Sequence, residues 1–295
     1  MVQDRHWGTG AVVLHRWSKP FRALSAGALA VLAGQSLALT GASAVDVAAA
    51  AARADAPAGV QATSADTTDP PLLPNLIVLE AADLSIQRTS AGRKLRFESA
   101  LGNVGRGPVE VRPNRNRPCP AGKQHASQIL YRDADGTGRF RRDIDTEVAR
   151  RSAGCMVFHR YHDHWHFEAA SRYSLYQKGN EETVRVARRK MSFCLRDSRR
   201  LPPSYGGWMY PQTYVACSKT SPQGISIGWV DVYQSYLAGQ AMLLPKNATD
   251  GLYCLQITVD PQNMLHESDD DDNTSMRAFR LDGDRIRLRD SSSCL

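Results

Sequence analysis

The chain contains the segment KLRFESALGNVGRGPVEVR at residues 94–112, in which apolar and polar residues alternate. Leu95, Phe97, Ser99 and Leu101 occupy every second position of its first half. Because successive side chains of a β-strand point to opposite faces, this pattern predicts a strand with one buried face. The glycine-rich GNVGRG that follows predicts a connection to a second strand, which begins near Val109.

The same alternation recurs along the chain. Strand-like segments are NLIVLEAADLSIQ (75–87), QILYRD (128–133), HWHFEAASRYSLY (164–176) and GLYCLQITVDP (251–261), and RAFRLDGDRIRLRD (277–290) resembles a hairpin. One helix is expected near residues 182–190. Many short strands with few helical periodicities predict an all-β fold, an antiparallel β-sandwich with long loops and little helix.

The first 74 residues differ in composition from the rest. Basic residues precede an apolar stretch at 23–39, and the small-residue sequence Ala42-Ser43-Ala44 follows it, which together predict a signal peptide at 1–44. A single membrane anchor is the alternative, but the stretch is short and diluted by polar residues. The Ala- and Pro-rich residues 45–74 predict a disordered linker. We therefore expect a secreted protein with a folded domain at 75–295 and no stable membrane anchor after cleavage.

The charge and the cysteine content indicate which partners and which cross-links to expect. The formal charge is +7, and removing residues 1–44, with four Arg or Lys and one Asp, leaves +4. Basic residues are scattered among acidic ones, so nucleic acid is not an expected partner. Six cysteines in an exported chain predict three disulfides, although six cysteines allow 15 pairings.

Histidines concentrate in FHRYHDHWHFE at residues 158–168, which holds His159, His162, His164 and His166. The last three alternate, so on an extended strand they would share one face. Neutral imidazoles bind copper, zinc, iron and nickel, and three of them with no nearby cysteine allow either copper(II) or a catalytic zinc. The pattern therefore predicts a metal site and leaves copper and zinc open.

Four separated motifs, in order, resemble the lysyl oxidase family. HRYHDHWHF resembles its copper-binding stretch, RRKMSFCLRDS the segment with its cofactor lysine, QGISIGWVDVYQSY the segment with its cofactor tyrosine, and ITVDPQNMLHESDDDDNT its ITVNP-like strand and acidic turn. The resemblance extends from about residue 75 to residue 281. A family cysteine within the copper stretch corresponds to Tyr161 here.

The resemblance implies a cofactor set that residue patterns alone do not. His162, His164 and His166 map onto the copper(II) ligands. Lys190 and Tyr233 map onto the two residues that form lysine tyrosylquinone, for which copper would bind Tyr233 as phenolate and activate it toward O2. Asp231 matches a family aspartate and would share a strand face with Tyr233, so we expect it to be the base.

The resemblance also implies a calcium ion that ties the acidic turn to the first strand. Carboxylate and carbonyl oxygens are ligands that Ca²⁺ prefers. The implied ligands are Glu267, Asp269, Asp272, Asn273, Asn75 and Leu76 through its carbonyl. A family aspartate corresponds to Asn75 here. Among the cysteines, Cys194 and Cys217 match family positions, so their pairing is expected first.

The sequence thus predicts a secreted, protein-lysine 6-oxidase-like copper amine oxidase. It would convert primary amines, such as a lysine side chain of an extracellular protein, to aldehydes with O2, releasing ammonia and hydrogen peroxide. Two alternatives remain. One is a secreted, non-enzymatic metal-binding β-sandwich, which needs neither Lys190 nor Tyr233. The other is a zinc hydrolase that uses the three histidines with a carboxylate base, for which Glu168 is nearest in sequence.

Overall fold

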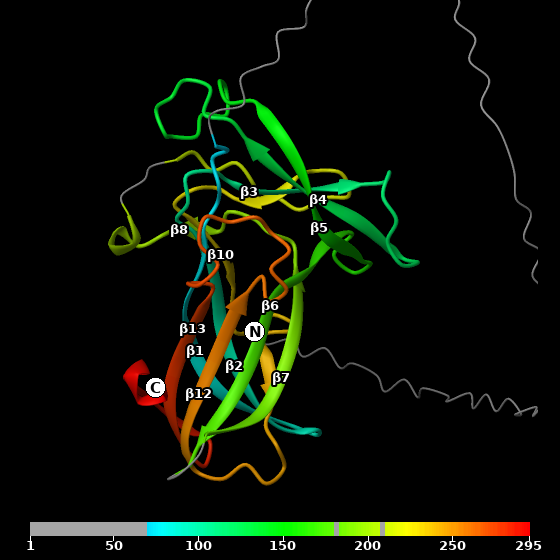
Figure 1. The fold of residues 1–295 in the computed structure, drawn as a ribbon. Helices are drawn as coiled ribbons and strands as arrows, with labels where there is room; N and C mark the ends of the chain where they lie inside the picture. The colour runs from blue at the N-terminus through cyan, green and yellow to red at the C-terminus, as the bar shows by residue number, and fades with distance from the viewer. Residues whose placement is uncertain (1–69, 180–182, 207–209) are drawn as a thin grey trace, which may run out of the picture. The chain divides into compact units, whose positions relative to one another are not determined.

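The computed structural model describes residues 70–179, 183–206 and 210–295 (Figure 1). Strands and two short 3-10 helices form the regular structure of these residues, which confirms the all-β fold. The strands are β1 Leu76–Thr89, β2 Gly92–Asn103, β3 Val109–Asn114, β4 Lys123–Tyr131, β5 Glu147–His159, β6 His164–Lys178, β7 Thr183–Phe193, β8 Arg199–Arg200, β9 Gln223–Ile225, β10 Trp229–Tyr233, β11 Ala241–Leu243, β12 Gly251–Val259, β13 Thr274–Asp282 and β14 Arg285–Arg289. The 3-10 helices are η1 Pro203–Tyr205 and η2 Ser291–Cys294.

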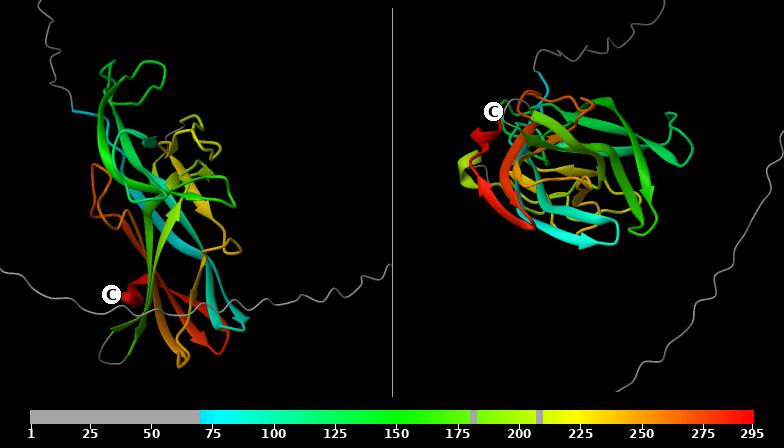
Figure 2. Two further views of the ribbon diagram at one scale, coloured as in Figure 1. Left: turned by 90° about the vertical axis from the view of Figure 1, so that its right-hand side faces the viewer. Right: turned by 90° about the horizontal axis from the view of Figure 1, so that it is seen from below.

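The strands form two sheets. One has the order β1-β2-β10-β8, with β11 also paired to β2. The other has the order β14-β13-β12-β6-β5-β4-β3-β9, with β7 also paired to β6. The strand pairs are antiparallel, and Figures 1 and 2 show β1 and β2 lying across from β6, β7 and β12.

The alternation predicted from residues 94–112 sets the packing between the sheets. Leu95, Phe97 and Leu101 of β2 are fully buried and belong to one apolar cluster with side chains of β6 and β12. The rings of Phe97 and Tyr173 meet edge to face, with centroids 4.9 Å apart. Ser99, the polar member of the alternation, is satisfied by a 2.8 Å hydrogen bond between its hydroxyl and that of Tyr173. The sandwich expectation is therefore confirmed.

The helix expected at 182–190 is wrong, because residues 183–193 form β7. This strand pairs with β6, with Lys190 opposite Arg172 and Arg188 opposite Ser174. The basic run has no strong strand pattern of its own. The adjacent long strand β6 supplies backbone partners, and such tertiary pairing overrides weak local helix preference.

The N-terminal predictions fall mainly outside the described residues. The predicted signal peptide at 1–44 and linker residues 45–69 lie there. Residues 70–74, the end of the predicted linker, contact the sandwich: Leu72 is buried, and its N–H donates to the carbonyl of Tyr131 at 2.8 Å. The described part of the chain has no helix long and apolar enough to cross a membrane.

Three disulfides join the six cysteines. They link Cys119 to Cys155, Cys194 to Cys217 and Cys254 to Cys294. The expected pairing of Cys194 with Cys217 is confirmed. This disulfide joins the segment after β7 to residues 216–217, and both of these segments line a cavity that also contains the clustered histidines.

Candidate functional site

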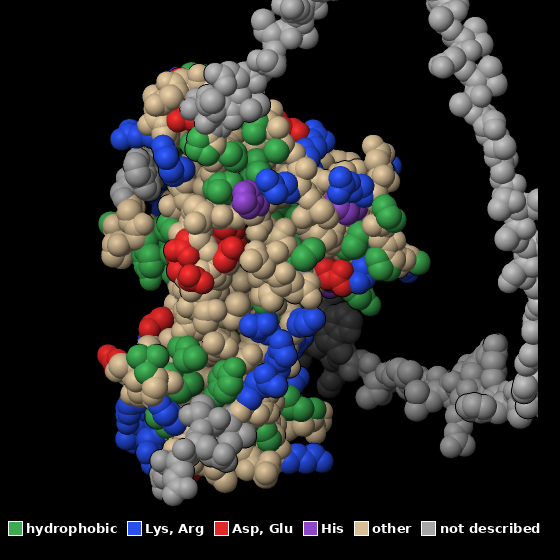
Figure 3. Space-filling view, viewed as in Figure 1, with side chains coloured by type: hydrophobic (Ala, Val, Ile, Leu, Met, Phe, Trp, Pro, Cys, Tyr) green, Lys and Arg blue, Asp and Glu red, His purple; other side chains and the backbone are tan. Residues whose placement is uncertain are grey.

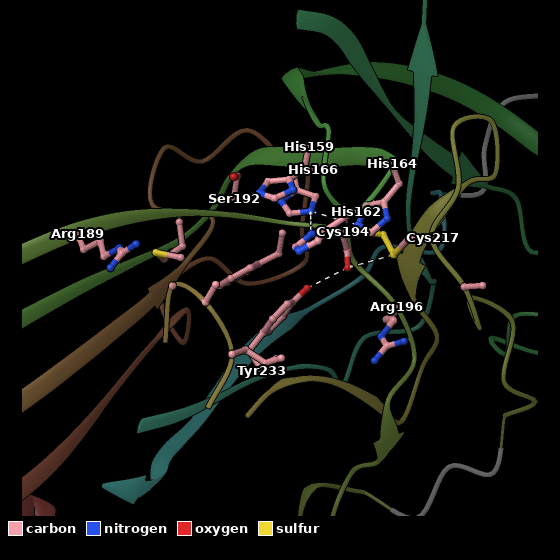
Figure 4. Close-up of a pocket in the computed structure, with 16 residues that line it drawn as sticks. His159, His162, His164, His166, Arg189, Ser192, Cys194, Arg196, Cys217 and Tyr233 are labelled. Atoms are coloured by element: carbon pink, nitrogen blue, oxygen red, sulfur yellow. Dashed lines mark hydrogen bonds between the residues drawn. A yellow bond between two sulfur atoms is a disulfide. The ribbon is translucent and has the colours of Figure 1, made fainter. Parts of the chain in front are cut away.

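A cavity of about 600 Å³ opens beside the hairpin between β5 and β6 (Figure 4). Its lining residues come from this hairpin, the end of β7, the segment after β7, residues 216–217, the end of β10 and residues 237–239. All four clustered histidines and Tyr233 face it. Its volume is within the range of small-molecule sites in proteins.

The three alternating histidines do not lie on one strand, contrary to the prediction from their spacing. His159 ends β5, His162 lies in the tight turn, and only His164 and His166 alternate on β6. The turn is closed by hydrogen bonds from the N–H groups of His162 and Asp163 to the carbonyl of His159, and Asp163 adopts a left-handed φ of 57°. The turn, rather than strand periodicity, therefore directs His162 toward the other two rings.

Three ring nitrogens converge in the cavity. Nε2 of His166 lies 3.2 Å from Nδ1 of His162 and 3.1 Å from Nε2 of His164. Nitrogens bound to one ion at about 2.0–2.1 Å and roughly right or tetrahedral angles are about 2.9–3.4 Å apart. Both separations from His166 are therefore compatible with ligands of one copper or zinc ion.

Electrostatics keep these imidazoles in the form that binds metal. Burial, reinforced by the neighbouring histidines, lowers the pKa of His166 to about 4. The pKa values of His162 and His164 are also lowered, chiefly by burial. Neutral imidazole is the ligand form, so little proton release is needed for metal to bind at neutral pH.

His159 packs against this donor set. Its ring stacks on His162 and His166, with centroids 3.9 and 4.8 Å apart. Its Nδ1 is buried without a hydrogen-bond partner, and its ring nitrogens come close to those of His162 and His166. His159 therefore lines the cavity and supports the rings of His162 and His166 by stacking on them.

Tyr233 forms the floor of the cavity, and Asp231 is buried beneath it. The Tyr233 hydroxyl donates to Asp231 Oδ2 at 2.5 Å and lies 2.9 Å from the carbonyl oxygen of Cys194. Its ring stacks on Phe193 with centroids 3.7 Å apart. These contacts hold the phenol edge near the histidines, as Figure 4 shows.

Burial controls the protonation of this pair. Asp231 is fully buried, which raises its pKa to about 7 although hydrogen bonds from Tyr233 and Ser198 and the charge of Arg196 act in the opposite direction. Burial and the adjacent carboxylate raise the pKa of Tyr233 well above its ordinary value. Asp231 can therefore hold or release a proton near neutral pH, as a general base must.

Lys190 does not approach Tyr233. Its neighbours Arg189 and Met191 line the cavity, whereas Lys190 is exposed and does not line it. Because neighbouring residues of a strand point to opposite faces, Lys190 lies on the outer face of β7, opposite Arg172. Figure 3 shows Lys and Arg side chains gathered over β6 and β7. Thus the expected proximity of Lys190 and Tyr233 is absent from this conformation.

The cavity contains groups that the sequence motifs had not indicated. Arg189 donates to the carbonyl of Ala241 at 2.9 Å, and Arg196 follows Cys194 by two residues. Nothing in the sequence marks these two arginines among many others. Glu168, the base expected for a zinc hydrolase, does not line the cavity and forms an ion pair with Lys123.

The acidic turn packs against the start of β1, as the resemblance implied. The N–H of Leu76 donates to Glu267 Oε2 at 2.6 Å, and the side-chain amide of Asn75 donates to Asp272 Oδ2 at 3.1 Å. Asn273 donates to Glu267 Oε1 at 3.2 Å. Asp269 is exposed and accepts the N–H of Asp271, so it lies at the rim of this group.

Two amide oxygens at this contact are buried without a donor: Oδ1 of Asn75, just before β1, and Oδ1 of Asn273, in the turn. Burial raises the pKa of Glu267 to about 8. Asp260, at the end of β12, adds a further buried carboxylate whose charge acts on Glu267 and whose Oδ1 is also unpartnered. Unpaired oxygens beside a buried carboxylate fit a hard cation.

The lysyl oxidase family profile matches residues 142–291, which include the histidines, Lys190, Tyr233 and the acidic turn. The match begins after β4, so Asn75 and Leu76 lie outside it.

Two curated proteins are similar to this chain over about half of its length. Lysyl oxidase homolog 4 of Mus musculus is 28% identical over 149 residues, and lysyl oxidase homolog 2 of Xenopus tropicalis is 29% identical over 145 residues. The alignments cover 50% and 49% of this chain, and only 18% and 17% of the relatives, so this chain corresponds to less than a fifth of their length. Because the family profile spans more than half of its residues, the chain belongs to the lysyl oxidase family.

Proposed function

We propose that this chain is a secreted copper-dependent amine oxidase that converts primary amines, including peptidyl lysine, to aldehydes. The observation that carries the proposal is the convergence of three neutral imidazoles in a cavity that also contains a phenol paired to a carboxylate. The overall reaction would be RCH2NH3⁺ + O2 + H2O → RCHO + NH4⁺ + H2O2. Family membership supports an oxidoreductase of this kind.

The metal in this proposal is copper(II), bound by His162, His164 and His166. Their nitrogen separations and lowered pKa values support a bound metal, and family membership favours copper over zinc. Copper(II) would supply a redox-active Lewis acid beside the Tyr233 phenol. Nearby, Phe193 fixes the phenol ring by stacking, and Asp231 holds its hydroxyl proton.

The organic cofactor in this proposal is lysine tyrosylquinone, formed from Lys190 and Tyr233. It would supply an electron-accepting carbonyl that reacts with a primary amine. Lys190 does not fit this role in the described conformation, because its side chain is on the outer face of β7. Formation of the crosslink therefore requires residues 189–191 to turn over, so that Lys190 faces the cavity.

Calcium is the second metal in the proposal, with Glu267, Asp272, Asn273 and Asn75 as its main ligands. Its support is the pair of unpartnered amide oxygens beside a buried carboxylate. Asp269 and the carbonyl of Leu76 would complete the set. The ion would tie the acidic turn to β1 and so stabilise the edge of the sandwich.

The test is peptide mass spectrometry of copper-loaded protein. We expect a covalent link between the peptides of Lys190 and Tyr233, a positive quinone redox stain, and hydrogen peroxide release with an amine. Tyr233→Phe should abolish all three. Tyr236→Phe is the matched control, because Tyr236 lies three residues away and is 72% exposed.

Two outcomes would contradict the proposal. Full oxidase activity without the crosslink would disprove the quinone cofactor while keeping the enzyme. An inactive, uncrosslinked protein that still binds metal stoichiometrically would identify a metal-binding β-sandwich instead.

A further inference from the structure

The described residues that line the cavity carry an unusual balance of charge. They include four histidines and two arginines, Arg189 and Arg196, but no carboxylate. Asp231 lies beneath the floor, fully buried and engaged by the Tyr233 hydroxyl. A copper ion on the histidines would add further positive charge. The space open to a ligand therefore has a positive potential.

Arg196 is the free cation of this lining. Its side chain is exposed, and it has no ion pair or side-chain hydrogen bond to another described residue. Its charge acts on His164 and on the Asp231–Tyr233 pair, so it lies close enough to influence both the histidines and the phenol. Arg189 is partly engaged with the carbonyl of Ala241. In the view of Figure 4 the two guanidinium groups lie on either side of Tyr233.

This charge pattern has opposite effects on the two parts of an amine substrate. A positive potential disfavours the ammonium form and favours the neutral amine, which is the nucleophile that any carbonyl cofactor needs. The same potential gives a simple alkylammonium no attraction to the cavity. A substrate with a carboxylate near its amine would be attracted through that carboxylate, and a guanidinium group binds carboxylates in a fixed, bidentate geometry.

We propose that Arg196, assisted by Arg189, selects peptidyl lysines flanked by Asp or Glu over those flanked by neutral or basic residues. This inference rests on the proposed amine oxidase function, which it extends by naming the substrate class. Arg196 holds the flanking carboxylate at the rim, and the lysine side chain extends toward Tyr233 and the histidines.

The test compares three capped peptides as substrates of the copper-loaded full chain: acetyl-Asp-Lys-Asp-amide, acetyl-Ala-Lys-Ala-amide and acetyl-Arg-Lys-Arg-amide. We expect kcat/KM to be about tenfold higher for the acidic peptide than for the basic one at low ionic strength. Raising NaCl to about 0.5 M should shrink this ratio toward one, because screening weakens exposed charge pairs. This salt titration needs no variant and so does not depend on the folding of a mutant.

The variants assign the preference to one side chain. Arg196→Gln should reduce the acidic-to-basic ratio to about threefold, and Arg196→Glu should invert it. Arg199→Gln is the matched control: it removes one positive charge from the same segment, and Arg199 pairs with Glu98 outside the cavity. It should keep the tenfold ratio. Equal rates with all three peptides, or an acidic preference that survives Arg196→Glu, would overturn the inference.

Binding measurements separate this inference from the proposed function. The same peptides with norleucine in place of lysine need no turnover, and their dissociation constants can be measured by calorimetry. If no peptide is oxidised but the acidic norleucine peptide binds tightest, and Arg196→Glu removes that preference, the oxidase proposal fails and the carboxylate site stands. If binding shows no charge preference, the carboxylate site fails irrespective of oxidase activity.

Discussion

The molecule contains two buried carboxylates whose pKa values are raised to a similar extent, in two very different settings. Asp231 lies under the histidine cavity with a pKa of about 7, and Glu267 lies between the acidic turn and β1 with a pKa of about 8. Asp231 receives hydrogen bonds from a phenol and a serine hydroxyl, and the proposed metal ligands above it are neutral imidazoles. Glu267 is surrounded by further carboxylates and by oxygens without donors.

Burial therefore prepares the two carboxyl groups for different roles, proton exchange at Asp231 and cation binding at Glu267. In the cavity, metal binding does not need the carboxylate, so Asp231 is free to exchange a proton near neutral pH. In the turn, the carboxyl group is itself a candidate ligand, and burial keeps it largely protonated near neutral pH until a cation replaces the proton. We therefore expect mutations in the first region to change chemistry and mutations in the second to change stability.

The largest effect is expected from His166→Ala, because Nε2 of His166 is the nitrogen shared by both short separations. Copper affinity should fall by at least about a hundredfold, since one of three ligands is lost and mutating residues that only support a metal ligand can already cost that much. Amine oxidation should disappear. Copper content is measured after dialysis by elemental analysis, with activity by peroxide release.

His266→Ala is the control for this change, since His266 is exposed and lies in the acidic turn. It should keep copper and activity. If His166→Ala also removed the stabilisation of the fold by calcium, the cavity and the acidic turn would not be independent of each other.

The next effect concerns Asp231. Asp231→Asn should lower kcat by roughly 10²–10⁴-fold while leaving copper content intact, because it removes a general base and not a metal ligand. In the wild type, the carboxyl is protonated below its pKa of about 7 and ionised above it, so kcat should rise as the pH passes through 7. The variant should lack this rise. Asp143→Asn, at a carboxyl far more exposed to solvent, should change neither value.

Much of this organisation could be predicted from the sequence where it depends on local pattern. The alternation of Leu95, Phe97 and Leu101 identified a strand with one buried face, and all three are fully buried. The histidine cluster is confined to one hairpin, so its members could be found together. Its arrangement could not, because the tight turn at Asp163 takes His162 off the strand.

The position of Lys190 shows why the residues of β7 that face the cavity could not be predicted from the sequence. Arg188, Arg189 and Lys190 are all cationic, so their order contains no signal of which face is buried. A shift of one residue in strand register exchanges the two faces. The pairing of β7 with β6 is irregular at two places on β6, between Phe167 and Ser171 and between Leu175 and Tyr176. Only the three-dimensional pairing decides that Arg189 and Met191 face the cavity.

The third effect is expected on stability and arises from Glu267. Without calcium, its pKa is raised from 4.5 to about 8, so the folded state holds a proton that the unfolded state has lost. The contribution of Glu267 to the free energy of unfolding is therefore greatest below pH 4.5. It declines as the pH rises from 4.5 to about 8, because the folded state must then give up the proton. Calcium at about 100 times its Kd should add about 2.7 kcal/mol and raise Tm by roughly 5–10 °C at neutral pH.

Glu267→Gln tests this assignment, because the amide keeps an oxygen for the Leu76 N–H but has no charge. The variant should lose both the calcium-dependent rise in Tm and the decline in stability between pH 4.5 and 8 in EDTA. Differential scanning calorimetry with calcium or EDTA measures both. A wild-type Tm that calcium does not change would remove calcium from the proposed function and leave the acidic turn without a ligand.

The smallest effect is expected from Asn75→Asp. The Asn75 amide donates to Asp272, whereas an aspartate would place a second negative charge against it. Calcium affinity should rise about tenfold through the added charged ligand, while Tm in EDTA should fall through carboxylate repulsion. The matched control is Asn263→Asp, because Asn263 also donates to a carboxylate of this turn, Asp270 at 3.3 Å, but is exposed and lacks the buried, unpartnered oxygen of Asn75. Calorimetric titration should show less than about a twofold change for the control. Equal gains for both variants would mean that net charge, rather than the buried oxygens beside β1, determines how the turn binds calcium.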